Sequence, residues 1–245
     1  MNTLDLLYAP VLGPHFLWHW LITGRYGARV LEKTGRIPDR FHASSTVALG
    51  GSDANFREAP CLWIHAVSVG EAAAAAKLGE MFHADNPFWD IRVSTTTATG
   101  RAMAERHFGE GNVIYFPLDF SGMASRAFDR IRPSLVVLME LELWPNFLAE
   151  AVRRNIPTVV AIAGITARSA RRLRLIPWLA RRMVMAVDEW YAQTEEYAQR
   201  LQLIGVPENR IEVTGSIKYD SIPDAIDPDA GRLYRRIFGC GEKFL

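Results

Sequence analysis

Cysteine is scarce in this sequence of 245 residues, and its scarcity excludes several kinds of protein. Cys61 and Cys240 lie far apart, and neither belongs to a Cys-x-x-Cys pair or has a histidine at metal-ligand spacing. We therefore expect a reducing compartment, with neither a disulfide scaffold nor a structural zinc site. Opposite charges also nearly balance, with a formal net charge of +1, so no global electrostatic field predicts a nucleic-acid partner.

Glycine is missing where a dinucleotide-binding protein needs it. The segment Ser68-Val69-Gly70-Glu71 follows an apolar run, but it lacks the paired glycines of the GxGxxG fingerprint that let a backbone approach a pyrophosphate. A nucleotide-binding Rossmann domain is thus a weaker alternative for the function. Gly70 still permits a tight turn or the close approach of a substrate.

Acidic residues are absent from Ala151 to Val187, where hydrophobic residues such as Trp178 and Met183 interleave with basic ones. A solvated helix face explains most runs of charge, whereas a surface that meets anionic lipid or phosphate explains the complete lack of acids. Both interpretations stay open. The basic residues of this stretch are Arg153, Arg154, Arg168, Arg171, Arg172, Arg174, Arg181 and Arg182.

Charge is also lacking near the amino end. Residues 6–22 carry no formal charge, and Trp18 and Trp20 near their end precede a flank of arginines and Lys33. An aromatic anchor followed by positive residues is typical of a segment held at the cytoplasmic face of a membrane. The run is short for a spanning helix, which needs about 20 apolar residues. We expect this segment to span the membrane or lie on it; a buried first helix is the alternative.

Short apolar runs alternate with segments of helical period after a polar, linker-like stretch at 39–59. Such alternation predicts a parallel sheet with helices on both faces, a Rossmann-like α/β fold. Strands are predicted at 62–68, 90–96, 112–116, 134–140, 158–163, 189–193 and 210–215, and helices at 70–84, 98–108, 121–131, 144–154, 168–186 and 194–204.

Polar motifs follow several of these strands, and the carboxyl ends of parallel strands share one edge of a sheet, so we expect a single cleft there. Glu140 and Glu142 end a very apolar strand, where unpaired carboxylates are costly. Their spacing places both on one side if the strand continues that far. Glu71, in the first turn of a helix, is either a helix-starting acid or a general base.

Longer segments carry a family pattern: LWIHAVSVGEAAAA, VSTTTATGRAMAE, YFPLDF, IRPSLVVLMELELWPN, AQTEEYAQRLQLIGVPENRIEVTGSIKYD and GRYGARVLEKTGRIP. Together they resemble the 3-deoxy-D-manno-octulosonic acid (Kdo) transferases of lipopolysaccharide assembly, from about residue 7 to residue 220. The resemblance implies the amino-terminal, acceptor-binding lobe of a GT-B glycosyltransferase. Such an enzyme would move Kdo from CMP-Kdo to a lipid A precursor, without a cofactor or bound metal, at the cytoplasmic face of the inner membrane.

The resemblance also assigns roles to residues. It implies Glu71, the glutamate after glycine, as the catalytic base, and it places the glutamate of the Glu-x-Glu motif at Glu140 or Glu142. The residues expected to bind substrate, from their motifs or their place after a strand, are Ser68, Gly70, Thr95, Thr96, Thr97, Gly100, Trp144, Arg168, Ser169 and Lys218.

The expected domain limits follow. Residues 1–38 are the membrane-associated segment with its basic flank, 39–59 the linker, 60–222 the acceptor-binding domain, and 223–245 a connection towards an absent second, donor-binding domain. The family's nucleotide-sugar pocket belongs mainly to that second domain, so we expect this chain to have an acceptor side and a base but little donor site. A non-catalytic, membrane-associated module that binds the acceptor lipid is the alternative function.

Overall fold

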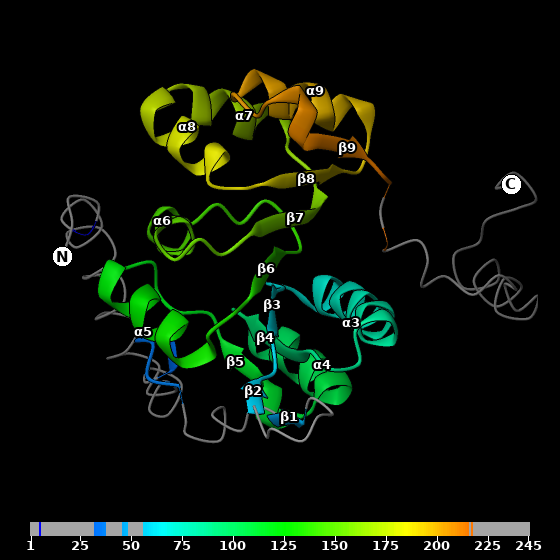
Figure 1. Ribbon diagram of the computed structural model, residues 1–245. Helices are drawn as coiled ribbons and strands as arrows, with labels where there is room; N and C mark the ends of the chain where they lie inside the picture. The colour runs from blue at the N-terminus through cyan, green and yellow to red at the C-terminus, as the bar shows by residue number, and fades with distance from the viewer. Residues whose placement is uncertain (1–4, 6–31, 38–45, 49–55, 216, 218–245) are drawn as a thin grey trace, which may run out of the picture.

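A computed structural model describes Asp5, residues 32–37, 46–48 and 56–215, and Ile217. Two short strands, β1 (Thr46–Ala48) and β2 (Phe56–Glu58), pair antiparallel within the stretch predicted as a linker. Figure 1 shows the main sheet as a stack of strands with helices to either side. The strands of this sheet are β3 (Cys61–His65), β4 (Asp90–Thr95), β5 (Val113–Tyr115), β6 (Leu135–Leu138), β7 (Thr158–Ala163), β8 (Glu189–Ala192) and β9 (Ile211–Val213).

The seven strands run parallel in the order β5-β4-β3-β6-β7-β8-β9. The order proceeds outward from β3 in one direction and from β6 in the other, so the chain reverses its winding between these two strands. In open parallel sheets, ligands bind outside the carboxyl ends of the strands at such a reversal. The predicted fold class, a Rossmann-like parallel sheet with helices on both faces, is confirmed.

Helices cover the two faces of the sheet unequally. Two of them, α3 (Val69–Asp85) and α4 (Ala98–Phe108), bury small residues such as Ala72 and Ala104 in one core cluster. The others contribute to a second, larger cluster around Trp63, Phe128 and Phe147 on the opposite face. These are α5 (Ser121–Ile131), α6 (Pro145–Arg153), α7 (Ala167–Arg174), α8 (Pro177–Met185) and α9 (Glu195–Leu203), with short 3₁₀ turns η2 (Glu110–Asn112) and η3 (Glu208–Arg210) beside strands.

Two predicted elements differ from the observed ones. The helix predicted over 168–186 is two helices, because Pro177 has no amide hydrogen and begins α8 after the break at Leu175 and Ile176. The strand predicted over 134–140 ends at Leu138, so it does not carry Glu140. The backbone beyond it turns, with the amide of Glu142 donating to the carbonyl of Glu140 at 2.8 Å.

Part of the amino-terminal region packs against the sheet domain. Glu32 accepts hydrogen bonds from the Tyr115 amide at 3.0 Å and from Arg101 at 2.6 Å. Asp5 accepts from the Ser121 amide at 2.9 Å, at the start of α5. Residues 6–22 lie outside the described residues, and no described helix is long and apolar enough to cross a bilayer. The predicted domain limits stay predictions.

Candidate active site

Glu71 lies at the carboxyl end of β3, where the winding of the sheet reverses. It stands at the third position of α3 and forms a capping box with Ser68: the hydroxyl of Ser68 accepts from the Glu71 amide, and the carboxylate of Glu71 accepts from the Ser68 amide. The signal Ser-x-x-Glu was visible in the sequence. Glu71 therefore does cap the start of α3, and a catalytic role for its carboxylate must be compatible with this capping box.

The hydrogen bonds of Glu71 leave one acceptor position free. Oε1 accepts from the Ser68 hydroxyl at 2.8 Å and from the Ser68 amide at 3.2 Å, whereas Oε2 accepts from the Val67 amide at 3.0 Å. A carboxylate has about four lone-pair positions. The carboxylate, on a residue only 5% exposed, is thus fixed in orientation, and one lone-pair position on Oε2 has no donor among the described residues.

Glu140 and Glu142 come from the turn after β6, the strand next to β3. Burial raises the pKa of Glu142, the hydrogen bond from the Trp144 indole lowers it, and the nearby charges of Glu71 and Glu140 raise it further. That indole nitrogen donates to Oε2 of Glu142 at 2.8 Å. The charges of Glu71 and Glu140 therefore act on Glu142, and we call these three residues the carboxylate cluster. A turn rather than a strand presents Glu140 and Glu142.

Leu141 and Leu143 explain how the turn presents its carboxylates. Both side chains pack against the larger core cluster, together with Trp144. Alternation of apolar and acidic residues thus persists after the strand has ended, with the leucines holding the turn against the core. Glu140 and Glu142 remain partly exposed.

The threonine-rich turn after β4 mainly supports the neighbouring loop. Thr97 Oγ1 accepts from the Gly100 amide at 3.0 Å and donates to the Val67 carbonyl at 3.0 Å, so it caps α4 and ties it to the loop before Glu71. Thr95 is fully buried, whereas Thr96 is partly exposed. Of the threonines predicted to bind substrate, only Thr96 and Thr97 are accessible here.

Gly70 and Gly100 differ in surroundings. A Cβ at Gly100 would lie 2.8 Å from Thr97 Oγ1 and 2.9 Å from the Val67 carbonyl oxygen, so the fold itself requires glycine there. A Cβ at Gly70 would meet nothing within 4 Å. Close packing therefore explains why position 100 is glycine, whereas Gly70 leaves open space beside Glu71.

His65 and Asp119 were not singled out from the sequence. His65 is fully buried beneath the site, and burial lowers its pKa to about 4. Asp119 accepts from the amides of Asn146 and Phe147 at 3.1 and 2.8 Å and thereby caps α6, whose own N-cap residue Trp144 makes no side-chain cap. Asp119 lies 27 residues from Asn146 and 28 from Phe147, so no local sequence pattern predicts these hydrogen bonds.

The acid-free arginine stretch divides into two groups in the structure. Arg153 and Arg154 form ion pairs with Glu150 at 2.6 and 2.7 Å. The exposed residues of α7 and α8, which we call the arginine cap, make no ion pair within the part of the chain that the structure describes. Their arginines are Arg168, Arg171, Arg172, Arg174, Arg181 and Arg182.

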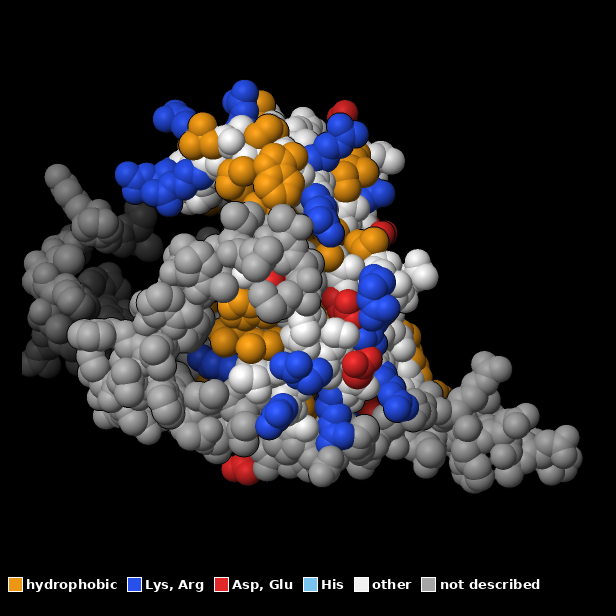
Figure 2. All heavy atoms as spheres, turned by 90° about the vertical axis from the view of Figure 1, so that its left-hand side faces the viewer, with side chains coloured by type: hydrophobic (Ala, Val, Ile, Leu, Met, Phe, Trp, Pro, Cys, Tyr) orange, Lys and Arg blue, Asp and Glu red, His pale blue; other side chains and the backbone are white. Residues whose placement is uncertain are grey.

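Exposed hydrophobic side chains lie among the arginines of the cap. Leu175 is 82% exposed and Trp178 is 57% exposed. Figure 2 shows basic and hydrophobic side chains together at the top of the molecule, where Figure 1 places α7 and α8. Positive charge mixed with exposed apolar side chains is typical of a surface that meets the interface of an anionic membrane.

The remaining predicted site residues occupy different places. Arg168 and Ser169 lie in the first turn of α7, after the carboxyl end of β7, and Thr166 caps that helix by accepting from the Ser169 amide at 3.2 Å. They belong to the same sheet edge as the carboxylate cluster but stand beyond β6. Lys218 lies outside the described residues. Among the residues that the structure does describe, no three His, Cys, Asp or Glu side chains are grouped as metal ligands.

Comparison with known proteins gives one family. A family model described as 3-deoxy-D-manno-octulosonic-acid transferase (kdotransferase) matches residues 29–221. The 3-deoxy-D-manno-octulosonic acid transferase of Haemophilus influenzae is 36% identical over 160 residues, covering 65% of this chain and 38% of that protein. The enzyme of the same name from Bordetella pertussis is 33% identical over 218 residues, covering 86% and 48%. The chain thus spans less than half the length of these two relatives.

Among solved structures, a UDP-GlcNAc 2-epimerase from Neisseria meningitidis bound to UDP-GlcNAc aligns with a TM-score of 0.49 and 13% sequence identity. The alignment covers 73% of this chain and 54% of that one.

Proposed function

The chain belongs to the Kdo transferase family of glycosyltransferases of lipopolysaccharide biosynthesis, and we propose that it is the acceptor-binding lobe of a GT-B enzyme. That enzyme transfers Kdo from CMP-Kdo to a lipid A precursor. The carboxylate cluster at the reversal of strand order is the observation that supports this proposal most, because it lies where open parallel sheets bind ligands. The donor pocket belongs mainly to the part of the relatives that this chain does not span.

Glu71 is the general base of this proposal. A hydroxyl of the acceptor donates to the free lone pair on Oε2, its oxygen bonds to the anomeric carbon of Kdo, and the bond from that carbon to CMP breaks. The proton passes to the Glu71 carboxylate, while the electron pair of the broken bond leaves with CMP. The capping box supports this role because it fixes the carboxylate before the substrate arrives.

Glu140 and Glu142 bind hydroxyl groups of the sugars in this proposal. Carboxylate oxygens accept hydrogen bonds from hydroxyls, and Glu142 is oriented by the indole of Trp144. Gly70 leaves space for the acceptor beside Glu71. The arginine cap, with its exposed Leu175 and Trp178, meets the phosphate groups and the membrane surface that carry the acceptor. The protein accordingly works at the cytoplasmic face of the inner membrane, with the amino-terminal segment, residues 6–22, as its anchor.

The test is Glu71→Gln in the enzyme completed by its second lobe. Glutamine can replace glutamate in the capping box with Ser68 but cannot take up the proton. Its NH2 group would face the Val67 amide that donates to Oε2 of Glu71, so we expect a lower melting temperature. We expect the rate of transfer per folded molecule to fall by about 10²–10⁴-fold, with acceptor affinity close to that of the wild type. Glu80→Gln, on the exposed side of the same helix, is the control and should leave the rate unchanged.

A variant that retains more than roughly a tenth of the rate would return Glu71 to a purely helix-capping role, since removal of a base has a larger effect. The non-catalytic alternative predicts a different result. In that case the wild-type chain binds the acceptor lipid but gives no transfer in any combination with a donor-binding lobe.

A further inference from the structure

Thr97 and Glu71 lie at the starts of two different helices, yet one peptide group connects them. The hydroxyl of Thr97 donates to the carbonyl oxygen of Val67 at 3.0 Å. That carbonyl belongs to the same peptide group as the amide of Ser68, which donates to Oε1 of Glu71 at 3.2 Å. The described residues contain no cis peptide bond, so the carbonyl and the amide of this group point in opposite directions. Thr97 and Glu71 therefore hold the same peptide plane from its two sides.

The hydroxyl of Thr97 has a fixed direction because it both accepts and donates within the fold. Its oxygen accepts from the Gly100 amide at 3.0 Å, and its single hydrogen goes to the Val67 carbonyl. Hydrogen bonds that are linked in a chain polarise one another, so a peptide group whose carbonyl accepts a hydrogen bond donates more strongly through its amide. The chain that starts at the Gly100 amide therefore ends on the carboxylate of Glu71.

Val67 contacts both partners of this chain. Its amide donates to Oε2 of Glu71 at 3.0 Å, while its carbonyl accepts from Thr97. Val67 and Ser68 form the short connection between β3 and α3, and both are only partly exposed. The orientation of the Glu71 carboxylate thus depends on where the backbone of this connection lies.

The start of α4 packs directly against this connection. A Cβ at Gly100 would lie 2.9 Å from the Val67 carbonyl oxygen and 3.4 Å from the carbonyl carbon of Ser68. At the end of α4 the contact with α3 is equally close, since a Cβ at Gly79 would lie 2.7 Å from the ring of Phe108. Figure 1 shows the two helices side by side. Glycine therefore permits close contact near the start and at the end of α4.

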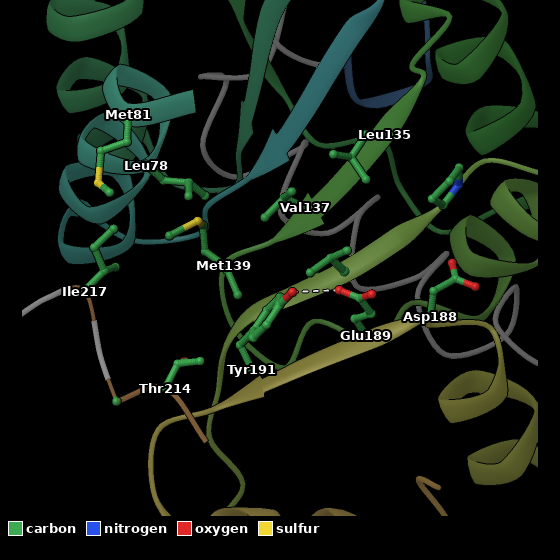
Figure 3. Close-up of a pocket in the computed structure, with 14 residues that line it drawn as sticks. Leu78, Met81, Leu135, Val137, Met139, Asp188, Glu189, Tyr191, Thr214 and Ile217 are labelled. Atoms are coloured by element: carbon green, nitrogen blue, oxygen red, sulfur yellow. Dashed lines mark hydrogen bonds between the residues drawn. The ribbon is translucent and has the colours of Figure 1, made fainter. Parts of the chain in front are cut away.

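The other flank of α3 borders a groove of about 860 Å³. Figure 3 shows Leu78 and Met81 of α3 at the edge of this groove and Leu135 and Val137 of β6 on its floor. The close contact with α4 is therefore what holds α3 from the side, and Thr97 supplies the polar part of that contact next to Glu71.

We propose that Thr97 is a positioning residue for the general base, because its hydroxyl fixes the Glu71 carboxylate through the peptide group between Val67 and Ser68. This inference rests on the proposed role of Glu71 as the base. Removal of the hydroxyl frees the Val67 carbonyl, and the peptide plane can then turn the Ser68 amide away from Oε1. The carboxylate is held less firmly towards the acceptor hydroxyl, so the proton transfers less often although the acceptor binds as before.

Two substitutions separate the hydroxyl from the rest of the side chain. Thr97→Val keeps the shape and removes the hydroxyl, whereas Thr97→Ser keeps the hydroxyl. In the enzyme completed by its second lobe, we expect Thr97→Val to lower kcat about tenfold, which is the upper end for one hydrogen bond. The KM for the acceptor should stay unchanged, and Thr97→Ser should have a kcat close to that of the wild type.

The matched control is Thr194→Val, because Thr194 caps α9 as Thr97 caps α4. Its hydroxyl oxygen accepts from the Tyr197 amide at 3.2 Å, far from Val67 in the sequence and at another strand of the sheet. Loss of either cap should lower the melting temperature. Only Thr97→Val should lower kcat per folded molecule, and an equal loss of kcat in Thr194→Val would overturn the inference.

Combination with Glu71→Gln separates positioning from general weakening of the fold. If Thr97 acts through Glu71, adding Thr97→Val to Glu71→Gln should lower the remaining rate by less than about twofold, since no base is left to position. The same loss in both backgrounds would show that Thr97 acts independently of Glu71 and would contradict the proposal.

Amide hydrogen exchange in the chain of residues 1–245 tests the geometry without any transfer activity. Thr97→Val should speed the exchange of the Ser68 amide about fivefold, whereas Thr194→Val should leave it unchanged. Unchanged exchange at Ser68, or an unchanged kcat in Thr97→Val beside a large loss in Glu71→Gln, would overturn this inference alone. An unchanged rate in Glu71→Gln would instead contradict the proposed function, and Thr97 would then have only a structural role.

Discussion

Gly70 and Gly100 both follow strands at the candidate site, and the sequence alone gave no reason to treat them differently. The structure separates them because a side chain at Gly100 would strike the backbone of Val67, the residue whose amide holds Glu71. At Gly70 a side chain would enter open space. One glycine therefore serves packing, and the other leaves volume next to a carboxylate.

Alanine at each position should give opposite results. Gly100→Ala overpacks the contact between α4 and the loop at Val67, so we expect a loss of about 1–3 kcal/mol in the free energy of unfolding. Gly70→Ala should not destabilise and can add about 0.5–1 kcal/mol, since alanine favours helix. Denaturant unfolding measures both. In the completed enzyme, Gly70→Ala should nevertheless raise the KM for the acceptor; unchanged kinetics would mean that the space is not used.

His65 makes stability depend on pH. Its ring stacks on Phe116 with centroids 3.9 Å apart, and burial lowers its pKa from 6.5 to about 4, although the hydrogen bond with the Ser94 carbonyl opposes this weakly. The unfolded chain binds the proton more readily than the folded one between these values. Stability should thus be complete above pH 6.5 and fall by up to about 1.4 kcal/mol per pH unit towards pH 4.

Urea unfolding at several pH values between 7 and 4 checks this prediction. His65→Asn should reduce the slope of stability against pH in that window, whatever its effect on absolute stability. His83→Gln, at an exposed position of α3, should keep the wild-type slope. If the His65 variant and the wild type have the same slope, another group is responsible for the acid sensitivity.

At the scale of elements, the sequence predicted most of the fold because each strand is a short apolar run and each helix has its own period. The prediction from sequence was wrong where a periodic pattern continued past the end of the actual helix or strand. The helical period of 168–186 continued through Pro177, although the proline divides it into α7 and α8. The alternation at Met139 to Leu143 continued past the end of β6, because a turn can keep the same alternation without pairing to a neighbour.

The candidate site was predicted only in part. Glu71, Glu140 and Glu142 could be brought together from the sequence because strand ends in a parallel sheet share an edge. The hydrogen bonds of Asp119 to the start of α6 and of Thr97 to Val67 could not, since they join residues far apart in the chain. Such contacts depend on tertiary distances of a few ångströms, which no local pattern encodes.

The arginine cap should bind anionic membranes through its charge. Arg181→Gln with Arg182→Gln removes two exposed charges of α8, each worth about 1 kcal/mol near an anionic surface. We expect about thirtyfold weaker partition into phosphatidylglycerol vesicles, measured by co-sedimentation at rising salt concentration. The control Lys77→Gln with Arg106→Gln removes two exposed charges from α3 and α4. Equal losses for the two pairs would show that only overall charge matters.

At the scale of the whole molecule, the chain spans 38% and 48% of the two transferases described above. We expect the purified chain to bind a bisphosphorylated lipid A precursor but to show no measurable transfer from CMP-Kdo and little affinity for it. Titration calorimetry with each ligand separately measures this, with inorganic phosphate as a control for simple charge binding. Tight binding of CMP-Kdo by this chain alone would contradict the division of donor and acceptor between two lobes.

The reversal of strand order also determines which strand pairings join neighbours in the sequence and which pairing joins distant segments. β4 pairs with β3, β5 with β4, β7 with β6, β8 with β7 and β9 with β8, so each of these pairings joins strands that are consecutive in the chain. The pairing of β3 with β6 is different, because it joins positions such as Cys61 and Ser134 that are 73 residues apart. Non-local pairing is the slow event in folding. Since Glu71 and Glu142 follow these two strands, the carboxylate cluster assembles only when that slow event is complete.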